Sequence, residues 1–129
     1  MKIYDLSQPL NQDAPFWPFY PPFEVKYIKR KAEHGVNAQY IMTSNHMGTH
    51  LDAPRHFVTG GMTIDEIPLD QCMGPAWVVD LMGITPRTLI QVSDLGDTKD
   101  NIRAGDSLLL RTDWSRHIGT PSYRNSLPR

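Results

Sequence analysis

One short segment holds most of the side chains that could bind a metal ion or transfer a proton. Residues 46–56 read His-Met-Gly-Thr-His-Leu-Asp-Ala-Pro-Arg-His and contain three of the five histidines of the chain. Neutral imidazoles and a carboxylate form a ligand set that suits Zn²⁺ and related divalent ions. An imidazole that titrates near neutral pH also suits proton transfer. The segment therefore predicts a metal site or a site that activates water.

The composition and spacing of this segment argue against both an α-helix and a straight β-strand. Gly48 and Pro54 disfavour a helix. In a straight strand His46, His50 and Asp52 would share one face, but the first and last would lie roughly 20 Å apart at ~3.3 Å per residue. Ligands of one ion lie only ~3–4 Å apart. Because Gly48 can bend without steric cost, we expect a curved loop around a metal. A polar surface loop rich in histidine is the alternative.

The pattern His-x-Gly-Thr-His-x-Asp-x-Pro-x-His resembles the signature of the cyclase-like metal-dependent hydrolases, which include bacterial kynurenine formamidase and isatin hydrolase. Residues 4–10, 74–81 and 105–114 resemble strands of the same family, so the likeness runs through nearly the whole chain. The resemblance implies an α/β (α+β) fold of the swivelling β/β/α type, with a β-rich N-terminal part, over a single domain of residues 1–129.

The resemblance also implies a role for each residue of the signature. His46, His50 and Asp52 match the metal ligands, with Asp52 able to bridge a second ion in a full-length parent. His56 matches the base that takes a proton from the attacking water and can return it to the leaving nitrogen. A fourth metal ligand, or a hydrogen bond to one of the ligands, is the alternative for His56. The donor set suits Zn²⁺ or Mn²⁺, and imidazole affinity favours Zn²⁺.

The activity implied by the family is hydrolysis of a C–N amide bond, in an N-formyl arylamine or a cyclic amide. Family members are longer than this chain, and a later His and Glu complete their metal site. Here no Glu follows Glu66, and His117 lies too close to the strand that precedes it. We therefore expect the N-terminal portion of the family fold, incomplete at its C-terminus, with an interrupted loop over residues 122–129. A non-catalytic metal-binding or structural module is the alternative function.

Aromatic residues gather in residues 15–23, where five of nine side chains are aromatic and prolines stiffen the backbone. Phe16 and Trp17 are candidates for contact with a flat aromatic amide substrate, and Trp17-Pro18 resembles a Trp-Pro pair of the family. Packing or a subunit contact is the alternative. Because exposed apolar patches usually mark interfaces, we expect a homodimer or larger homo-oligomer with this segment at or beside the contact.

Composition narrows the classes of protein to which this chain can belong. The chain has 129 residues, 40% hydrophobic and 21% charged, which is ordinary for one globular domain. A net charge of −1 argues against a nucleic-acid partner, and no apolar run approaches the ~20 residues that span a membrane. Without an apolar leader, we expect a cytoplasmic protein. The single Cys72 excludes an internal disulfide.

The pattern of apolar residues predicts a β-rich chain. Two strands joined around His34-Gly35 would form a hairpin, and two later apolar runs are typical of buried strands. Thr63 and Glu66 form a capping-box pattern for a short helix that Pro68 ends. The segment 93–100 is a short helix or a loop. The expected strands are residues 2–6, 24–31, 36–43, 76–81 and 107–111.

Overall fold

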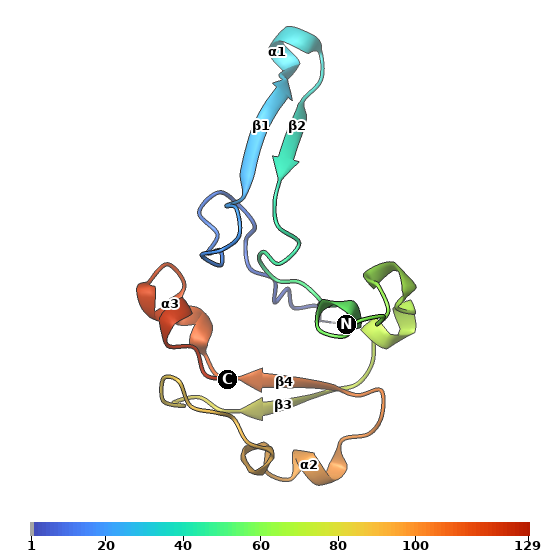
Figure 1. The fold of residues 1–129 in the computed structure, drawn as a ribbon, viewed down its shortest axis with the longest axis vertical. Coiled ribbons are helices and arrows are strands. Elements are labelled where there is room, and N and C mark those ends of the chain that lie inside the picture. Colours follow the sequence, from blue (N-terminus) through green and yellow to red (C-terminus); the bar gives the residue numbers. More distant parts are fainter. Residues whose placement is uncertain (1) are drawn as a thin grey trace. The chain divides into compact units, whose positions relative to one another are not determined.

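Two separate two-stranded sheets organise the chain, one antiparallel and one parallel (Figure 1). The computed structural model describes residues 2–129, and these fall into two compact units. The first unit ends at Asp52 and the second runs from Ala53 to Arg129. Mixed short helices and strands of this kind agree with the α+β class expected from the sequence.

The sheet of the first unit is the predicted hairpin. Strand β1 (Glu24–Lys29) pairs with β2 (Ala38–Met42), with a shift in register between Tyr27 and Lys29. The one-turn helix α1 (Lys31–His34) lies in the connection. It ends at Gly35, whose φ of 74° lies in the left-handed region that glycine adopts readily. Figure 1 shows the hairpin extending from the loops of its own unit.

The strand predicted for residues 2–6 is wrong, because the structure describes no regular element before β1. A strand needs a neighbour to satisfy its backbone groups. Directly after this segment, the backbone N–H of Ser7 donates to Asp5 Oδ1 at 2.9 Å, and that of Gln8 donates to Thr49 Oγ1 at 2.9 Å, so both bonds go to side chains and not to a neighbouring strand. Ile3 is 81% exposed, so the apolar alternation of this segment does not face a core.

The second unit contains the parallel sheet and most of the short helices. Strands β3 (Ala76–Asp80) and β4 (Ser107–Arg111) pair in register along their whole length. Helix α2 (Thr98–Asn101) lies in the connection between them, and α3 (Pro121–Asn125) follows β4. The 3₁₀ helices of this unit span Pro54–His56, Ile64–Glu66, Leu69–Cys72, Val92–Leu95 and Trp114–His117.

Two local predictions are confirmed in this unit. The capping box forms, with the Thr63 backbone N–H donating to Glu66 Oε2 at 2.7 Å, although the helix it begins is a single 3₁₀ turn. The segment 93–100 contains parts of a 3₁₀ helix and of α2. None of the helices among residues 2–129 is long and apolar enough to cross a membrane.

The loop predicted for residues 122–129 is wrong in part. Most of α3 falls there, and proline at the first position suits a helix start. The Trp114 indole N–H donates to the Tyr123 carbonyl at 3.2 Å, and the Arg129 backbone N–H donates to the Thr88 carbonyl at 2.9 Å. These contacts hold the last residues against the earlier chain of the same unit.

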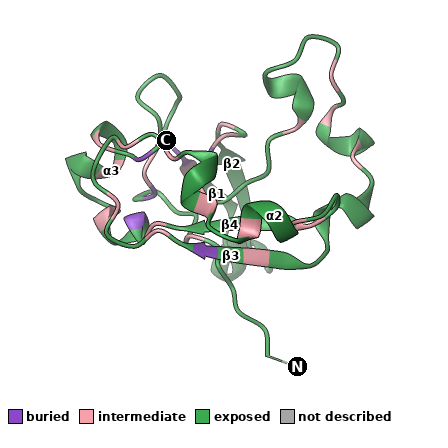
Figure 2. Ribbon diagram, turned by 90° about the horizontal axis from the view of Figure 1, so that it is seen from below, coloured by how far each residue is buried: buried purple, intermediate pink, exposed green. Residues whose placement is uncertain are grey.

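Few side chains are fully shielded from solvent, as the colouring of Figure 2 shows. The expectation that β3 and β4 are buried strands is wrong for most of their residues. Val79 is 7% exposed, but Val78 is 62% exposed and Leu109 is 40% exposed. The apolar runs therefore form the expected strands, but most of their side chains are exposed. The buried hydrophobic residues of the described chain are Ala14, Phe23, Met47, Val79 and Trp114.

Candidate metal centre

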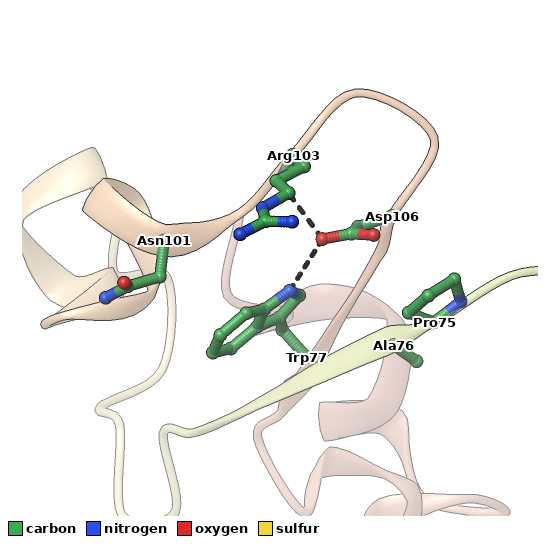
Figure 3. A pocket seen from close by; sticks show the side chains of 6 residues that line it. All are labelled: Pro75, Ala76, Trp77, Asn101, Arg103 and Asp106. Atoms are coloured by element: carbon green, nitrogen blue, oxygen red, sulfur yellow. Dashed lines mark hydrogen bonds between the residues drawn. The ribbon is translucent and has the colours of Figure 1, made fainter.

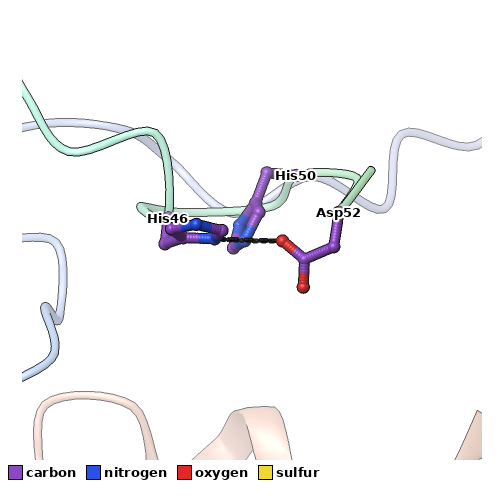
Figure 4. A group of neighbouring side chains, drawn as sticks. All are labelled: His46, His50 and Asp52. Carbon is purple, nitrogen blue, oxygen red and sulfur yellow. Dashed lines mark hydrogen bonds and ion pairs between the residues drawn. The ribbon is translucent and has the colours of Figure 1, made fainter. Parts of the chain in front are cut away.

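His46, His50 and Asp52 bring one donor atom each to a common point (Figure 4). His46 Nδ1 lies 3.0 Å from Asp52 Oδ1, and His50 Nε2 lies 3.2 Å from the same oxygen. The two imidazole nitrogens are 3.3 Å apart. Ligands that each bind one ion at about 2.1 Å are separated by roughly these distances. The three side chains therefore have the spacing of three ligands of a single ion.

The backbone of residues 46–52, here called the ligand loop, has the predicted bend. Gly48 has a φ of 65°, in the left-handed region where a side chain would be strained. A Cβ atom at this position would also lie 3.3 Å from the Leu10 Cδ1 atom. The loop contains no helix or strand, which agrees with the argument from ligand spacing.

A backbone contact sets the orientation of His50. Its Nδ1 atom lies 2.9 Å from the Gly48 carbonyl oxygen. A carbonyl can only accept, so this contact is a hydrogen bond when Nδ1 carries the proton, and the neutral imidazole then has its lone pair on Nε2, toward the cluster. Bonds of this kind, from the nitrogen that does not bind the metal, commonly orient histidine ligands. Of the two neutral tautomers, the contact therefore favours the one that a ligand binding through Nε2 requires.

His56 lies in the second unit, in the 3₁₀ helix Pro54–His56. Its backbone N–H donates to the Ala53 carbonyl at 2.9 Å. Its ring meets the Phe57 ring edge-on, with centroids 4.1 Å apart. The three clustered side chains belong to the first unit. The structure therefore brings three of the four signature residues together, and the role of His56 stays a prediction.

The aromatic segment of residues 15–23 is divided between packing and exposure. Phe16 packs against the core cluster of its own unit, whereas Trp17 is 48% exposed. The Tyr20 backbone N–H donates to the Trp17 carbonyl at 2.9 Å and closes a turn. Packing, the alternative reading of this segment, accounts for Phe16 and Phe23. The substrate role of Phe16 and Trp17 stays a prediction.

Two hydrogen bonds to Asp106 in the second unit, here called the polar tie, were not predicted from the sequence. The Trp77 indole N–H donates to Asp106 Oδ2 at 2.8 Å, and the Arg103 backbone N–H donates to the same oxygen at 3.0 Å (Figure 3). The bond from Trp77, followed by that from Arg103, lowers the pKa of Asp106 below its usual value. Trp77 lies in an apolar run that the sequence predicts as a buried strand, but its indole joins β3 to the turn before β4. The cavity here, of about 450 Å³, is lined by Pro75, Ala76, Trp77, Asn101, Arg103 and Asp106.

The chain belongs to the Cyclase family, which its residues 4–129 match. This confirms the resemblance on which the expected fold class rested. Kynurenine formamidase of Bacillus anthracis is 35% identical over 128 residues, which are 98% of this chain and 58% of that relative. The chain thus spans little more than half the length of the curated relatives it matches.

Solved structures show the same fold. Isatin hydrolase A from Labrenzia aggregata, bound to benzyl benzoate, is 28% identical with a TM-score of 0.77 over 92% of this chain and 53% of that one. A structure described as a potential metal-dependent hydrolase with cyclase activity is 31% identical, with a TM-score of 0.68 over 89% of this chain and 52% of that one. The chain therefore shares its family and fold with proteins named kynurenine formamidase and isatin hydrolase.

Proposed function

We propose that this chain carries the metal centre of a hydrolase that cleaves C–N amide bonds. The observation that carries the proposal is the convergence of His46, His50 and Asp52, whose donor atoms all lie within 4.8 Å of one another. Two imidazoles and a carboxylate fit Zn²⁺, or Mn²⁺ as the second choice. Relatives named kynurenine formamidase and isatin hydrolase support the reaction class.

The donor atoms of the chain have distinct tasks in this proposal. His50 presents Nε2 because its Nδ1–H is bonded to a carbonyl, and Asp52 supplies the negative charge that offsets the charge of a cation. When bound, a divalent ion supplies Lewis acidity, which polarises a carbonyl and makes water acidic enough to react near neutral pH. In a full-length parent, Asp52 would also help to hold a second ion, which would add to the same Lewis acidity.

We assign proton transfer to His56. An imidazole can accept the proton of the attacking water and return it to the leaving nitrogen, because its ordinary pKa lies close to neutrality. The family signature supports this role through the position of His56 after Asp-x-Pro. If His56 is instead a metal ligand, its loss removes metal and turnover together.

The substrate class that we propose is a small aromatic amide, either an N-formyl arylamine or a cyclic amide. The names of the relatives support this class. The proposed contacts for the aromatic ring are Phe16 and Trp17, and about half of the Trp17 side chain is accessible.

We further propose that residues 1–129 act as one domain of a cytoplasmic homodimer or larger homo-oligomer, with residues 15–23 near the subunit contact. Light scattering coupled to size-exclusion chromatography measures the number of chains in the assembly directly.

A non-catalytic metal-binding module is the second candidate function. It is supported by the three donor groups, which all come from the first unit of the chain. In that case the ligand loop would bind metal to hold the fold or an assembly together. Both candidates require the same three ligands, so metal binding alone does not separate them.

Turnover separates the two candidates. The purified chain, loaded with Zn²⁺ or Mn²⁺, would be assayed for hydrolysis of N-formylkynurenine and isatin, with His56→Ala as the matched variant. Hydrolase function predicts that His56→Ala keeps its metal and loses about 10²–10⁴-fold in rate. A metal-loaded wild-type chain that hydrolyses neither compound would support the binding module instead.

A further inference from the structure

The ligand loop does not stand free in its unit, because the preceding N-terminal segment contacts it residue by residue. The backbone N–H of Gln8 donates to Thr49 Oγ1 at 2.9 Å. The side chain of Leu10 lies against Gly48, so closely that an added Cβ would approach it to 3.3 Å. These two contacts are made by the two loop residues that directly precede His50.

The contacts continue toward the start of the loop. Met47, 6% exposed, belongs to one buried cluster with Ala14 and Phe23. The ring of Tyr20 stacks on the ring of His46, with centroids 5.9 Å apart and an angle of 24° between the planes. As the N-terminal segment runs from Gln8 through Leu10 and Ala14 to Tyr20, its partners run backward along the loop from Thr49 to His46.

We propose that residues 8–23 are a scaffold that holds the ligand loop in its metal-binding shape, with Tyr20 as the positioning residue for His46. Met47 is anchored in the buried cluster immediately after His46, which fixes the backbone, and Tyr20 covers one face of the imidazole. An imidazole on a fixed backbone keeps freedom about its side-chain torsions, and a stacked ring restricts that freedom. Tyr20 therefore holds Nδ1 of His46 toward Asp52, from which it lies 3.0 Å.

The neighbouring residue on the same turn provides a control. Phe19 is 87% exposed, whereas Tyr20 is 37% exposed and contacts His46. Both are aromatic and lie between the same prolines, so replacing either one removes an aromatic side chain from the same turn. Only replacement of Tyr20 removes the stacked ring from a proposed ligand.

The test compares the Zn²⁺ affinity of Tyr20→Leu, Phe19→Leu and Tyr20→Phe in the apo chain, measured by competition with a chromogenic chelator. We expect Tyr20→Leu to bind Zn²⁺ about 3- to 10-fold more weakly, the range of one aromatic stack. Phe19→Leu and Tyr20→Phe should keep wild-type affinity. At saturating Co²⁺, the ligand-field bands of Tyr20→Leu should also differ from those of the wild type, since His46 is then less well oriented.

Equal Zn²⁺ affinities for Tyr20→Leu and Phe19→Leu, whether unchanged or reduced, would overturn the positioning role. If Tyr20→Leu does not fold by circular dichroism, Tyr20→Met carries the same comparison, because its flexible side chain refills the space. This inference rests on the ligand role of His46 in the proposed function. A wild-type chain that binds no Zn²⁺ overturns that function, whereas Zn²⁺ binding that is insensitive to Tyr20 overturns only the scaffold.

Discussion

The ligand loop and the β3–β4 sheet differ in how far the chain itself determines them. In the ligand loop, the backbone bends at Gly48, Met47 is buried, and the three donor atoms converge. In the sheet, the two strands pair fully, yet Val78 on β3 is 62% exposed. Parallel strands are ordinarily covered on both faces. The first region thus has its donor groups brought together beside one buried side chain, whereas the second is determined only in its backbone pairing.

This difference has a consequence for function. The ligand loop is held by residues of its own unit, so metal binding is expected to be a property of this chain. The leucines of β4 are between 36% and 41% exposed, which leaves that strand without the packing that positions side chains accurately. Chemistry that depends on the second unit, including the proton transfer proposed for His56, should therefore be more sensitive to changes elsewhere in the protein than metal binding is.

Removing a ligand should produce the largest effect. Asp52→Ala or His46→Ala deletes one of three donor groups, and each should weaken Zn²⁺ binding by more than the ~10–100-fold that is typical for outer partners of a ligand. His34→Ala, in the same unit but in α1, is the matched control and should bind normally. Dialysis against a weak chelator followed by metal analysis measures the effect. Full occupancy in either ligand variant would contradict the assignment.

Burial provides the sharpest comparison within the sheet. Val79→Ala removes two methyl groups from a side chain that is 7% exposed, and should lower the free energy of unfolding by about 2 kcal/mol. Val78→Ala, one residue earlier and 62% exposed, should cost less than about 0.5 kcal/mol. Urea denaturation of both variants checks this. Equal losses would show that the Val78 face is covered in solution and would remove the contrast with the ligand loop.

Backbone geometry links the bend of the loop to metal binding. Gly48→Ala places a side chain at a φ of 65° and close to Leu10, so it should destabilise the fold by about 1–2 kcal/mol and weaken Zn²⁺ binding. Gly35→Ala has a similar φ, 74°, with open space around it. It should carry the backbone penalty and leave Zn²⁺ affinity unchanged. Loss of affinity in both variants would mean that the bend at Gly48 has no special role.

The polar tie of the second unit predicts the smallest effect. The pKa of Asp106 is lowered in the folded chain, chiefly by the Trp77 indole N–H. Its contribution to stability is therefore present above the ordinary carboxyl pKa of about 3.9 and is lost as the pH falls through the folded pKa. Trp77→Phe should raise the pKa of Asp106, and Trp17→Phe should not. Carbon NMR titration of the Asp106 carboxyl group measures its pKa in both variants. An unchanged pKa of Asp106 in Trp77→Phe would exclude this tie.

Local patterns predicted much of what the structure shows. The hairpin followed from two β-rich runs and Gly35, the capping box from Thr63 and Glu66, and the curved loop from the spacing of His46 and Asp52. In each case the residues that decide the conformation lie close together in the sequence. The swivelling β/β/α fold came from the family resemblance, because no periodicity specifies how such elements assemble.

The failures involve relations over long distances in the chain. Residues 2–6 alternate like a strand, but no local signal reveals whether a partner strand lies beside them. Apolar runs such as β4 predict a strand without revealing whether anything covers it. The stack of Tyr20 on His46 joins residues 26 positions apart, and the bond of Trp77 to Asp106 joins residues 29 apart. Only the folded chain brings these side chains together.

Anomalous diffraction from a crystal of the Zn²⁺-loaded protein tests the central claim most directly. The account predicts one strong peak at the zinc edge within about 2.0–2.2 Å of His46 Nδ1, His50 Nε2 and an oxygen of Asp52. A peak held by other residues, or a loaded crystal with no peak between these three side chains, would contradict it.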